Sequence, residues 1–205
     1  MTPVALGFRA GRGGSVVVGV AVDPLPRVVV SAFLATAAEG DRLAFEPYQV
    51  AYEMPRAEGG GPTADAAAAV AEGRRRQAAL ASTAVAGLLE GLNIEGFRPA
   101  VAALLINRAG WMTERLEHSL SAPAHPPVAE GLAVRVALRA AFAGARLDIV
   151  EMDEKSLRES AMLMLPLTSG QIDYQLNALG ATAGRPWRRE QKTACLAAWV
   201  ATAGF

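Results

Sequence analysis

The chain has 205 residues, and its 20 lysine and arginine residues balance its 20 aspartate and glutamate residues. This length supports one domain with a sizeable apolar core, and we expect a single domain over residues 1–205. The neutral total excludes a global field that would draw the protein to nucleic acid or to an anionic membrane, but it leaves room for a local basic patch.

The chain carries one cysteine, Cys195, within an apolar helical run, so no intramolecular disulfide can form. We interpret Cys195 as a small buried hydrophobe. Arg9 and Arg12 interrupt the apolar sequence at the N-terminus, which argues against a secretory signal, and the apolar run 16–22 is too short to span a bilayer. We therefore expect a cytoplasmic protein that does not contact a membrane.

Three short apolar runs open the chain, at residues 3–10, 15–22 and 27–36. In the first run Val4, Leu6 and Phe8 alternate with smaller or polar residues, so Arg9 should point away from the face that carries Phe8. A glycine-rich turn at 11–14 and a proline-containing turn at 23–26 separate the runs. The pattern predicts three consecutive strands.

Helices and strands alternate in the rest of the chain. Residues 37–62 have the pattern of a half-buried edge segment with a short extra strand. Thr63 can cap a helix that runs to Leu92. A fourth strand ending at Ile106, helices at 111–122 and 128–143, a fifth strand at 147–151 and further helices, the last at 188–203, complete the pattern. A strand–helix–strand unit of this length normally makes a right-handed parallel crossover.

This layout resembles the ribonuclease H-like superfamily, and especially its Holliday-junction resolvase branch. Three segments carry the resemblance: Leu6-Gly7-Phe8-Arg9, Leu105-Ile106-Asn107 and the alanine-rich helix at 192–200. The chain is also similar to uncharacterised bacterial proteins with a Pro-Trp-Arg segment near the C-terminus. The resemblance implies an α/β fold with a five-stranded mixed sheet in the order 3-2-1-4-5 and helices on both faces.

The resemblance also implies metal-binding carboxylates that this chain lacks. Resolvases carry an aspartate on the first strand, a glutamate at the end of the fourth, and one or two aspartates on the last helix. The corresponding positions here are Arg9, Asn107 and either Glu190 or Thr193. A two-metal centre needs several carboxylates around ions about 4 Å apart, and a guanidinium cannot ligate a cation. We therefore expect a catalytically degenerate member with no metal or other cofactor.

Arginines near the ends of the first and fourth strands form a candidate anion site. Arg9, Arg12 and the glycine turn can offer guanidinium and backbone N–H donors to a phosphate or carboxylate. Asn107, Arg108 and Trp111 follow the fourth strand, where ligands of open α/β sheets tend to bind. The alternative is a solvated hairpin whose glycines only make the turn, with Trp111 as an apolar lid on the next helix.

A second basic cluster precedes the last helix and is a candidate nucleic-acid surface. It combines one aromatic residue with four cationic ones: Arg185, Trp187, Arg188, Arg189 and Lys192. Such a mixture suits phosphate contacts and base stacking. Basic residues at a helix N-terminus oppose the helix dipole, so we expect Glu190 or a bound anion to compensate them.

Other charged residues have simpler interpretations. Glu114 and His118 share a helix face, but a metal site would also need Glu117 and His125, so we interpret them as surface neighbours. The run of three arginines at 74–76 indicates a solvated half of a helix. Glu130 is expected to pair with Arg135 or Arg139 and to be structural.

Three functions are consistent with these patterns. The preferred one is a non-catalytic ribonuclease H-like domain that binds an anionic ligand, phosphate-bearing or nucleic acid, or a protein partner. The rival is a metal-dependent nuclease that uses displaced carboxylates at Glu151, Asp153 and Glu190. The third is a subunit of a larger assembly or a homo-oligomer, since the Ala-rich helices leave room for a buried interface.

Overall fold

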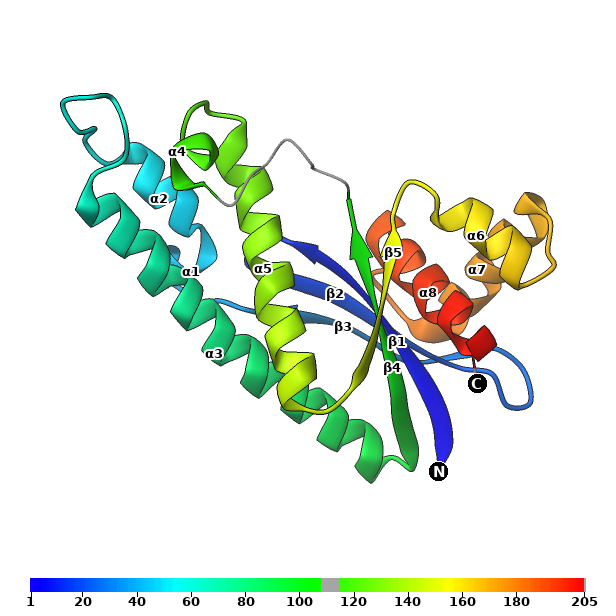
Figure 1. The fold of residues 1–205 in the computed structure, drawn as a ribbon. Helices are drawn as coiled ribbons and strands as arrows, with labels where there is room; N and C mark the ends of the chain where they lie inside the picture. The colour runs from blue at the N-terminus through cyan, green and yellow to red at the C-terminus, as the bar shows by residue number, and fades with distance from the viewer. Residues whose placement is uncertain (108–114, 205) are drawn as a thin grey trace.

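A computed structural model describes residues 1–107 and 115–204 and contains one mixed sheet (Figure 1). Within the described residues the sheet has five strands in the order β3-β2-β1-β4-β5. The strands are β1 (Thr2–Gly11), β2 (Gly14–Ala21), β3 (Arg27–Ala35), β4 (Phe97–Ile106) and β5 (Asp148–Asp153). β1, β2 and β3 pair antiparallel, whereas β4 is parallel to β1 and β5 is parallel to β4. The predicted α/β class and strand order are confirmed.

Helices cover both faces of the sheet (Figure 1). One face packs against the long helix α3 (Ala64–Ile94) and the crossover helix α5 (His125–Gly144). The other packs against α6 (Leu157–Met164), α7 (Ser169–Ala183) and α8 (Arg189–Ala201), which a short 3₁₀ helix, Thr202–Gly204, follows. Within the described residues, none of the helices is long and apolar enough to cross a lipid bilayer.

Alternation along β1 decides which helices it contacts. Val4, Leu6 and Phe8 are fully buried on the α3–α5 side, where the rings of Phe8 and Phe142 lie 4.7 Å apart between centroids. Residues of the other parity, Ala5 among them, face α8. Arg9 has this second parity, as the sequence predicts, and its side chain therefore leaves the sheet on the α8 side.

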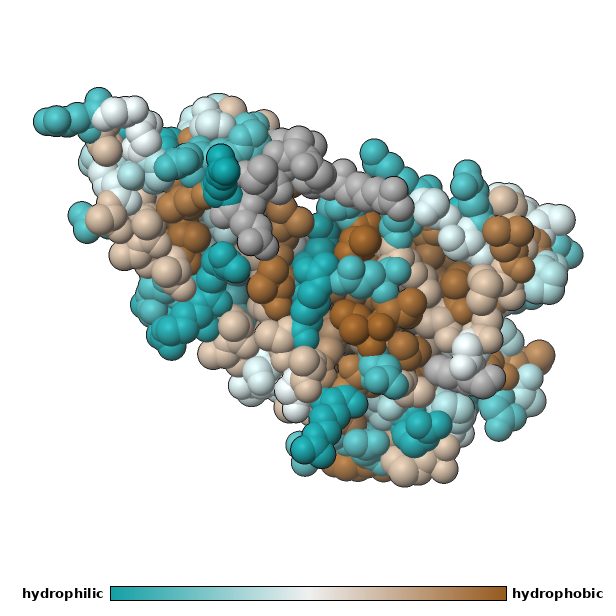
Figure 2. Space-filling view, in the orientation of Figure 1, coloured by the Kyte–Doolittle hydropathy of each residue, from teal (hydrophilic) through white to brown (hydrophobic). Residues whose placement is uncertain are grey.

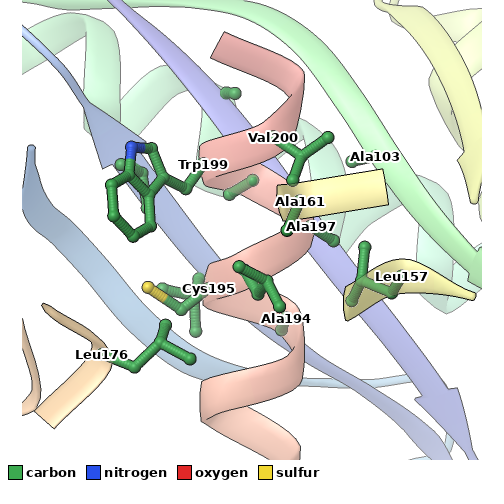
Figure 3. Close-up of a cluster of buried hydrophobic side chains, with 14 of the residues drawn as sticks. Ala103, Leu157, Ala161, Leu176, Ala194, Cys195, Ala197, Trp199 and Val200 are labelled. Atoms are coloured by element: carbon green, nitrogen blue, oxygen red, sulfur yellow. The ribbon is translucent and has the colours of Figure 1, made fainter. Parts of the chain in front are cut away.

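Helix α8 lies directly on β1 because the residues at the contact are small. A Cβ atom on Gly7 would lie 1.9 Å from the carbonyl oxygen of Ala194 and 2.8 Å from the backbone nitrogen of Ala198. Figure 3 shows the surrounding buried side chains of α8, including Ala194, Cys195 and Ala197. This contact places the start of α8 beside the ends of β1 and β5, where the candidate site lies.

The predicted extra strand within residues 37–62 is wrong. The segment instead forms two short helices, α1 (Arg42–Phe45) and α2 (Pro47–Glu53). The side chain of Asp41 accepts a hydrogen bond from the backbone N–H of Ala44 at 3.1 Å and so begins α1, while Pro47 occupies the first turn of α2. Caps and tertiary contacts outweigh the strand-like alternation of the aromatic residues there.

The other predicted helices exist with shifted ends. The crossover helix begins at His125 rather than residue 128, and the last helix ends at Ala201. Of the helix predicted at 111–122, the structure describes α4 (Leu116–Ser119), and the part before residue 115 lies outside the described residues. Thr63 caps α3 as predicted, because its Oγ1 accepts a hydrogen bond from the backbone N–H of Ala66.

Candidate anion-binding site

Arg9 and Glu154 meet where the parallel strands end. Glu154 directly follows β5, and its backbone N–H donates to the carbonyl oxygen of Ile106 on β4 at 2.8 Å. Arg9 Nε donates to Glu154 Oε1 at 3.0 Å, and the two side chains are 28% and 20% exposed. The arginine of the first strand is therefore fixed by a carboxylate that no motif in the sequence marks.

Asn107 is also held by an arginine. Its Oδ1 accepts a hydrogen bond from Arg135 Nη1, on α5, at 2.6 Å. Arg135 is almost fully buried, and burial lowers the pKa of its guanidinium. Its Nε has no hydrogen-bond partner among the residues that the structure describes. At both positions where the resemblance implies a carboxylate, a guanidinium group is present: Arg9 itself on β1, and Arg135 hydrogen-bonded to Asn107 after β4.

The donor set at these strand ends does not fit a two-metal centre. Among residues 1–107 and 115–204, no group of three or more His, Cys, Asp or Glu side chains could hold a metal ion. The three carboxylates of the rival nuclease hypothesis have different partners. Glu151 pairs with Arg139, and Asp153 accepts a hydrogen bond from the backbone N–H of Lys155. Glu190 lies in the first turn of α8.

The hairpin half of the predicted anion site is not assembled. Arg12 Nη1 pairs with Glu46 Oε2 at 3.2 Å, so Arg9 and Arg12 face different partners. The turn glycines serve packing: Gly13 has φ +71°, and a Cβ on it would lie 2.3 Å from the ring of Phe45. Two further predicted residues, Arg108 and Trp111, lie outside the described residues.

A groove of about 400 Å³ opens between α6, α7, the start of α8 and Glu154. Its floor contains three leucines that are at most 5% exposed, Leu157, Leu176 and Leu196. Its other lining residues include four cationic ones: Arg158, Arg188, Arg189 and Lys192. The groove therefore gathers most of the basic cluster that the sequence predicts, next to the ion pair of Arg9. Arg185 is exposed and does not line the groove.

The charges of the groove are only partly compensated. Arg158 pairs with Asp173, and Lys192 Nζ donates to Asn177 Oδ1 at 2.8 Å. Arg188 and Arg189 are exposed and form no ion pair within the part of the chain that the structure describes. The expected compensation by Glu190 is thus not seen as an ion pair, and two arginines remain beside the positive end of the α8 dipole.

Trp187 builds a wall of the groove. Its indole N–H donates to the carbonyl oxygen of Leu176 at 2.9 Å. Its ring lies against Gly180, where an added Cβ would come within 2.2 Å of ring atoms. Trp187 is therefore held by α7 and shapes the groove. The sequence signal for this contact is weak, because a glycine within a helix does not by itself indicate that an aromatic ring packs against it.

A second groove, of about 740 Å³, lies at the opposite end of α8. Its lining is mostly apolar and includes Val150, Met152 and Val200. Figure 2 shows the hydrophobic residues that gather beside β5 on this side of the molecule. Such a surface does not suit an anion, so the first groove is the candidate site.

The remaining sequence candidates have structural roles. The rings of His118 and His125 stack with centroids 4.9 Å apart, and Glu114 lies outside the described residues. Within the arginine run, Arg75 and Arg76 form ion pairs with Glu72, which agrees with a solvated helix face. Cys195 is fully buried, and burial raises the pKa of its thiol to about 12, so it is the expected buried hydrophobe and not a nucleophile.

The expected pairing of Glu130 with Arg135 or Arg139 is wrong. Glu130 is fully buried, and its Oε1 accepts the backbone N–H groups of Tyr48 and Gln49 at 2.8 and 3.1 Å. The carboxylate thus caps the start of α2 from a distant part of the chain. A cap contributed by a residue more than 80 positions away leaves no local signal in the sequence.

The strand order, the parallel crossover through α5 and the helices on both faces define a ribonuclease H-like fold. Solved structures that resemble this chain include Holliday-junction resolvases. Thermus thermophilus RuvC in complex with a Holliday junction matches with a TM-score of 0.55 and 12% identity, over 98% of this chain and 93% of that one. RuvC of the same organism in a second structure gives 0.54 and 11% over the same shares.

The yeast mitochondrial resolvase Ydc2 aligns with a TM-score of 0.46 and 13% identity, over 99% of this chain and 77% of that one. No protein-family model matches the sequence, and no curated protein matches it. The resemblance is therefore one of fold, and the site residues have to be judged by their own chemistry.

Proposed function

We propose that this protein binds nucleic acid through its phosphates, without cleaving it, at the groove beside α8. The observation that carries the proposal is the pair of exposed arginines, Arg188 and Arg189, which line the groove without acidic partners in the described chain. Guanidinium forks and the positive end of a helix both favour phosphate oxygens. RuvC, which has the same fold, is known in complex with a Holliday junction, and this supports nucleic acid as the ligand.

The absence of cleavage follows from the chemistry at the strand ends. Hydrolysis by two metal ions needs carboxylates that hold both ions. Here Arg9 already pairs with Glu154, Arg135 adds a buried positive charge, and Asn107 supplies only an amide that is already hydrogen-bonded. A guanidinium close to a divalent cation raises the free energy of metal binding. The proposal places the protein in the cytoplasm, as the sequence suggests.

The test is fluorescence anisotropy with a labelled single strand and a labelled four-way junction, in EDTA and at low salt. We expect binding that does not need a divalent ion. The double substitution Arg188→Ala/Arg189→Ala should weaken it by about tenfold or more, because two phosphate contacts are lost. The control is Arg74→Ala/Arg75→Ala, which makes the same change in charge on exposed residues of α3.

Two outcomes would contradict the proposal. Equal affinities of the two double variants would place the nucleic acid elsewhere, and no binding at all would remove nucleic acid as the ligand. Cleavage of the junction in Mg²⁺ or Mn²⁺ that Glu190→Ala abolishes would establish the rival nuclease instead.

A further inference from the structure

The groove beside α8 has an apolar floor, which contact with phosphates alone does not require. Leu157, Leu176 and Leu196 form this floor. Its volume of about 400 Å³ falls within the range of small-molecule sites, roughly 300 to 1,000 Å³. An apolar floor with a cationic rim suits a flat ring that carries a phosphate, which is the chemistry of a nucleotide.

Glu154 lines the groove, although a site for phosphate alone has no use for a carboxylate. A bare carboxylate would repel a phosphate, but the ion pair with Arg9 neutralises this one. A carboxylate has about four lone-pair positions, and Arg9 Nε occupies one of them. No other hydrogen bond to the Glu154 side chain occurs within the described residues, so the groove contains an acceptor with spare capacity.

The carboxylate of Glu154 can distinguish guanine from the other nucleobases by their hydrogen-bonding groups. Guanine carries an N1–H and an N2–H side by side, and a carboxylate can accept both. Adenine and cytosine offer an amino group next to an acceptor nitrogen, and thymine offers one N–H between two carbonyl groups, so each would set a lone pair against the carboxylate. An amide at the same position would not make this distinction, because it carries a donor as well as an acceptor.

We propose that the groove binds one guanine nucleotide, with the base on the leucine floor, its N–H donors on Glu154 and its phosphate toward Arg188 and Arg189. This inference rests on the proposed function and adds a base preference to it. The same chemistry is offered by a free guanine nucleotide and by an unpaired guanosine in a strand. Glu154 is the residue that determines the preference, and Arg9 is a positioning residue that holds its carboxylate.

Calorimetric titration in EDTA with GMP, IMP and AMP tests the preference. We expect GMP to bind about tenfold more tightly than AMP, because a good bidentate contact is worth this much discrimination or more. IMP, which lacks the amino group, should lie between them. Glu154→Gln should remove the preference for GMP without lowering the affinity for AMP. The variant keeps an oxygen that can accept from Arg9, and the control Glu159→Gln changes an exposed carboxylate on α6 outside the groove.

Binding experiments with oligonucleotides distinguish a free guanine nucleotide from an unpaired guanosine within a strand as the ligand. The probes are a thymidine-only strand and the same strand with one central guanosine. A preference for the guanosine strand that Glu154→Gln removes, with no binding of free GMP, assigns the groove to guanosine within nucleic acid. Absence of any guanine preference in both assays would overturn the inference. It would leave the proposed function intact if strand binding still required Arg188 and Arg189, whereas loss of all strand binding would overturn the proposed function itself.

Discussion

Arg9 and Asn107 occupy positions at which the resemblance to resolvases implies carboxylates, and both substitutions are visible in the sequence because strand ends are easy to locate. Their partners are not visible. Glu154 lies 145 residues from Arg9, and Arg135 lies 28 residues from Asn107. The sequence therefore predicts that carboxylates are missing at these positions, while only the structure shows that the arginine charges are held by ion pairs and hydrogen bonds around the strand ends.

Glu130 gives the protein a measurable response to pH. Burial raises the pKa of this carboxyl from 4.5 to about 7, although the N–H groups of Gln49 and Tyr48 and the nearby charge of Arg12 oppose the shift. The folded state thus binds the proton more tightly than the unfolded state does. This contribution to stability is complete below the unfolded pKa and is lost as the pH rises through about 7, by about 3 kcal/mol in total.

Urea denaturation of the wild type and of Glu130→Gln between pH 5 and pH 8 measures this contribution. The glutamine keeps an oxygen for the N–H groups of Tyr48 and Gln49 but does not titrate in this range. We expect the free energy of unfolding of the wild type to fall relative to the variant as the pH rises. Parallel pH profiles would show that Glu130 keeps one protonation state throughout.

At the scale of elements, the strands and most helices could be predicted because their apolar periodicity matches their burial. β1 illustrates this, since the residues of one parity are those buried against α3 and α5. Residues 37–62 could not be predicted, because aromatic spacing in that segment suits an edge strand and a short helix equally. The choice is made by Asp41, Pro47 and the remote carboxylate of Glu130, and the last of these contacts is tertiary.

The contact between α8 and β1 depends on the absence of a side chain at Gly7. Gly7→Ala would bring a methyl group against the backbone of α8, at 1.9 Å from the carbonyl oxygen of Ala194, so the helix must move. We expect a loss of about 3 kcal/mol in the free energy of unfolding, at the upper end of overpacking effects. Gly11→Ala is the matched control on the same strand, because no atom of the described chain lies within 4 Å of its added Cβ.

Denaturant titrations of the two variants give the comparison. The prediction requires the midpoint of Gly7→Ala to fall well below that of Gly11→Ala, which should stay close to the wild type. The start of α8 lines the groove, so the Gly7→Ala variant, with its displaced helix, should also bind nucleic acid more weakly than the wild type. Equal midpoints would mean that α8 lies farther from β1 than the structure shows.

At the scale of the whole molecule, the total charge is zero, but positive and negative side chains are not evenly paired over the surface. Many arginines are neutralised one by one, as Arg12 is by Glu46 and Arg42 is by Glu53, so they add little to any long-range field. Arg74, Arg98 and Arg146 also form no ion pair within the described residues, but Arg188 and Arg189 are adjacent in the chain and line the same groove. Composition excludes a globally basic protein, but it cannot show that two unpaired arginines lie side by side at one groove.

The salt dependence of binding counts the phosphates that this unpaired charge contacts. For single strands the logarithm of the binding constant falls with the logarithm of the salt concentration by about 0.7 for each phosphate neutralised. Removing Arg188 and Arg189 together should therefore reduce the slope by about 1.4. The slope is measured by anisotropy titrations at salt concentrations from about 50 to 200 mM.

The variant Arg74→Ala/Arg75→Ala should keep the wild-type slope, because those residues lie on α3, across the sheet from the groove. A weaker affinity for Arg188→Ala/Arg189→Ala with an unchanged slope would mean that the two arginines support the groove without touching phosphate.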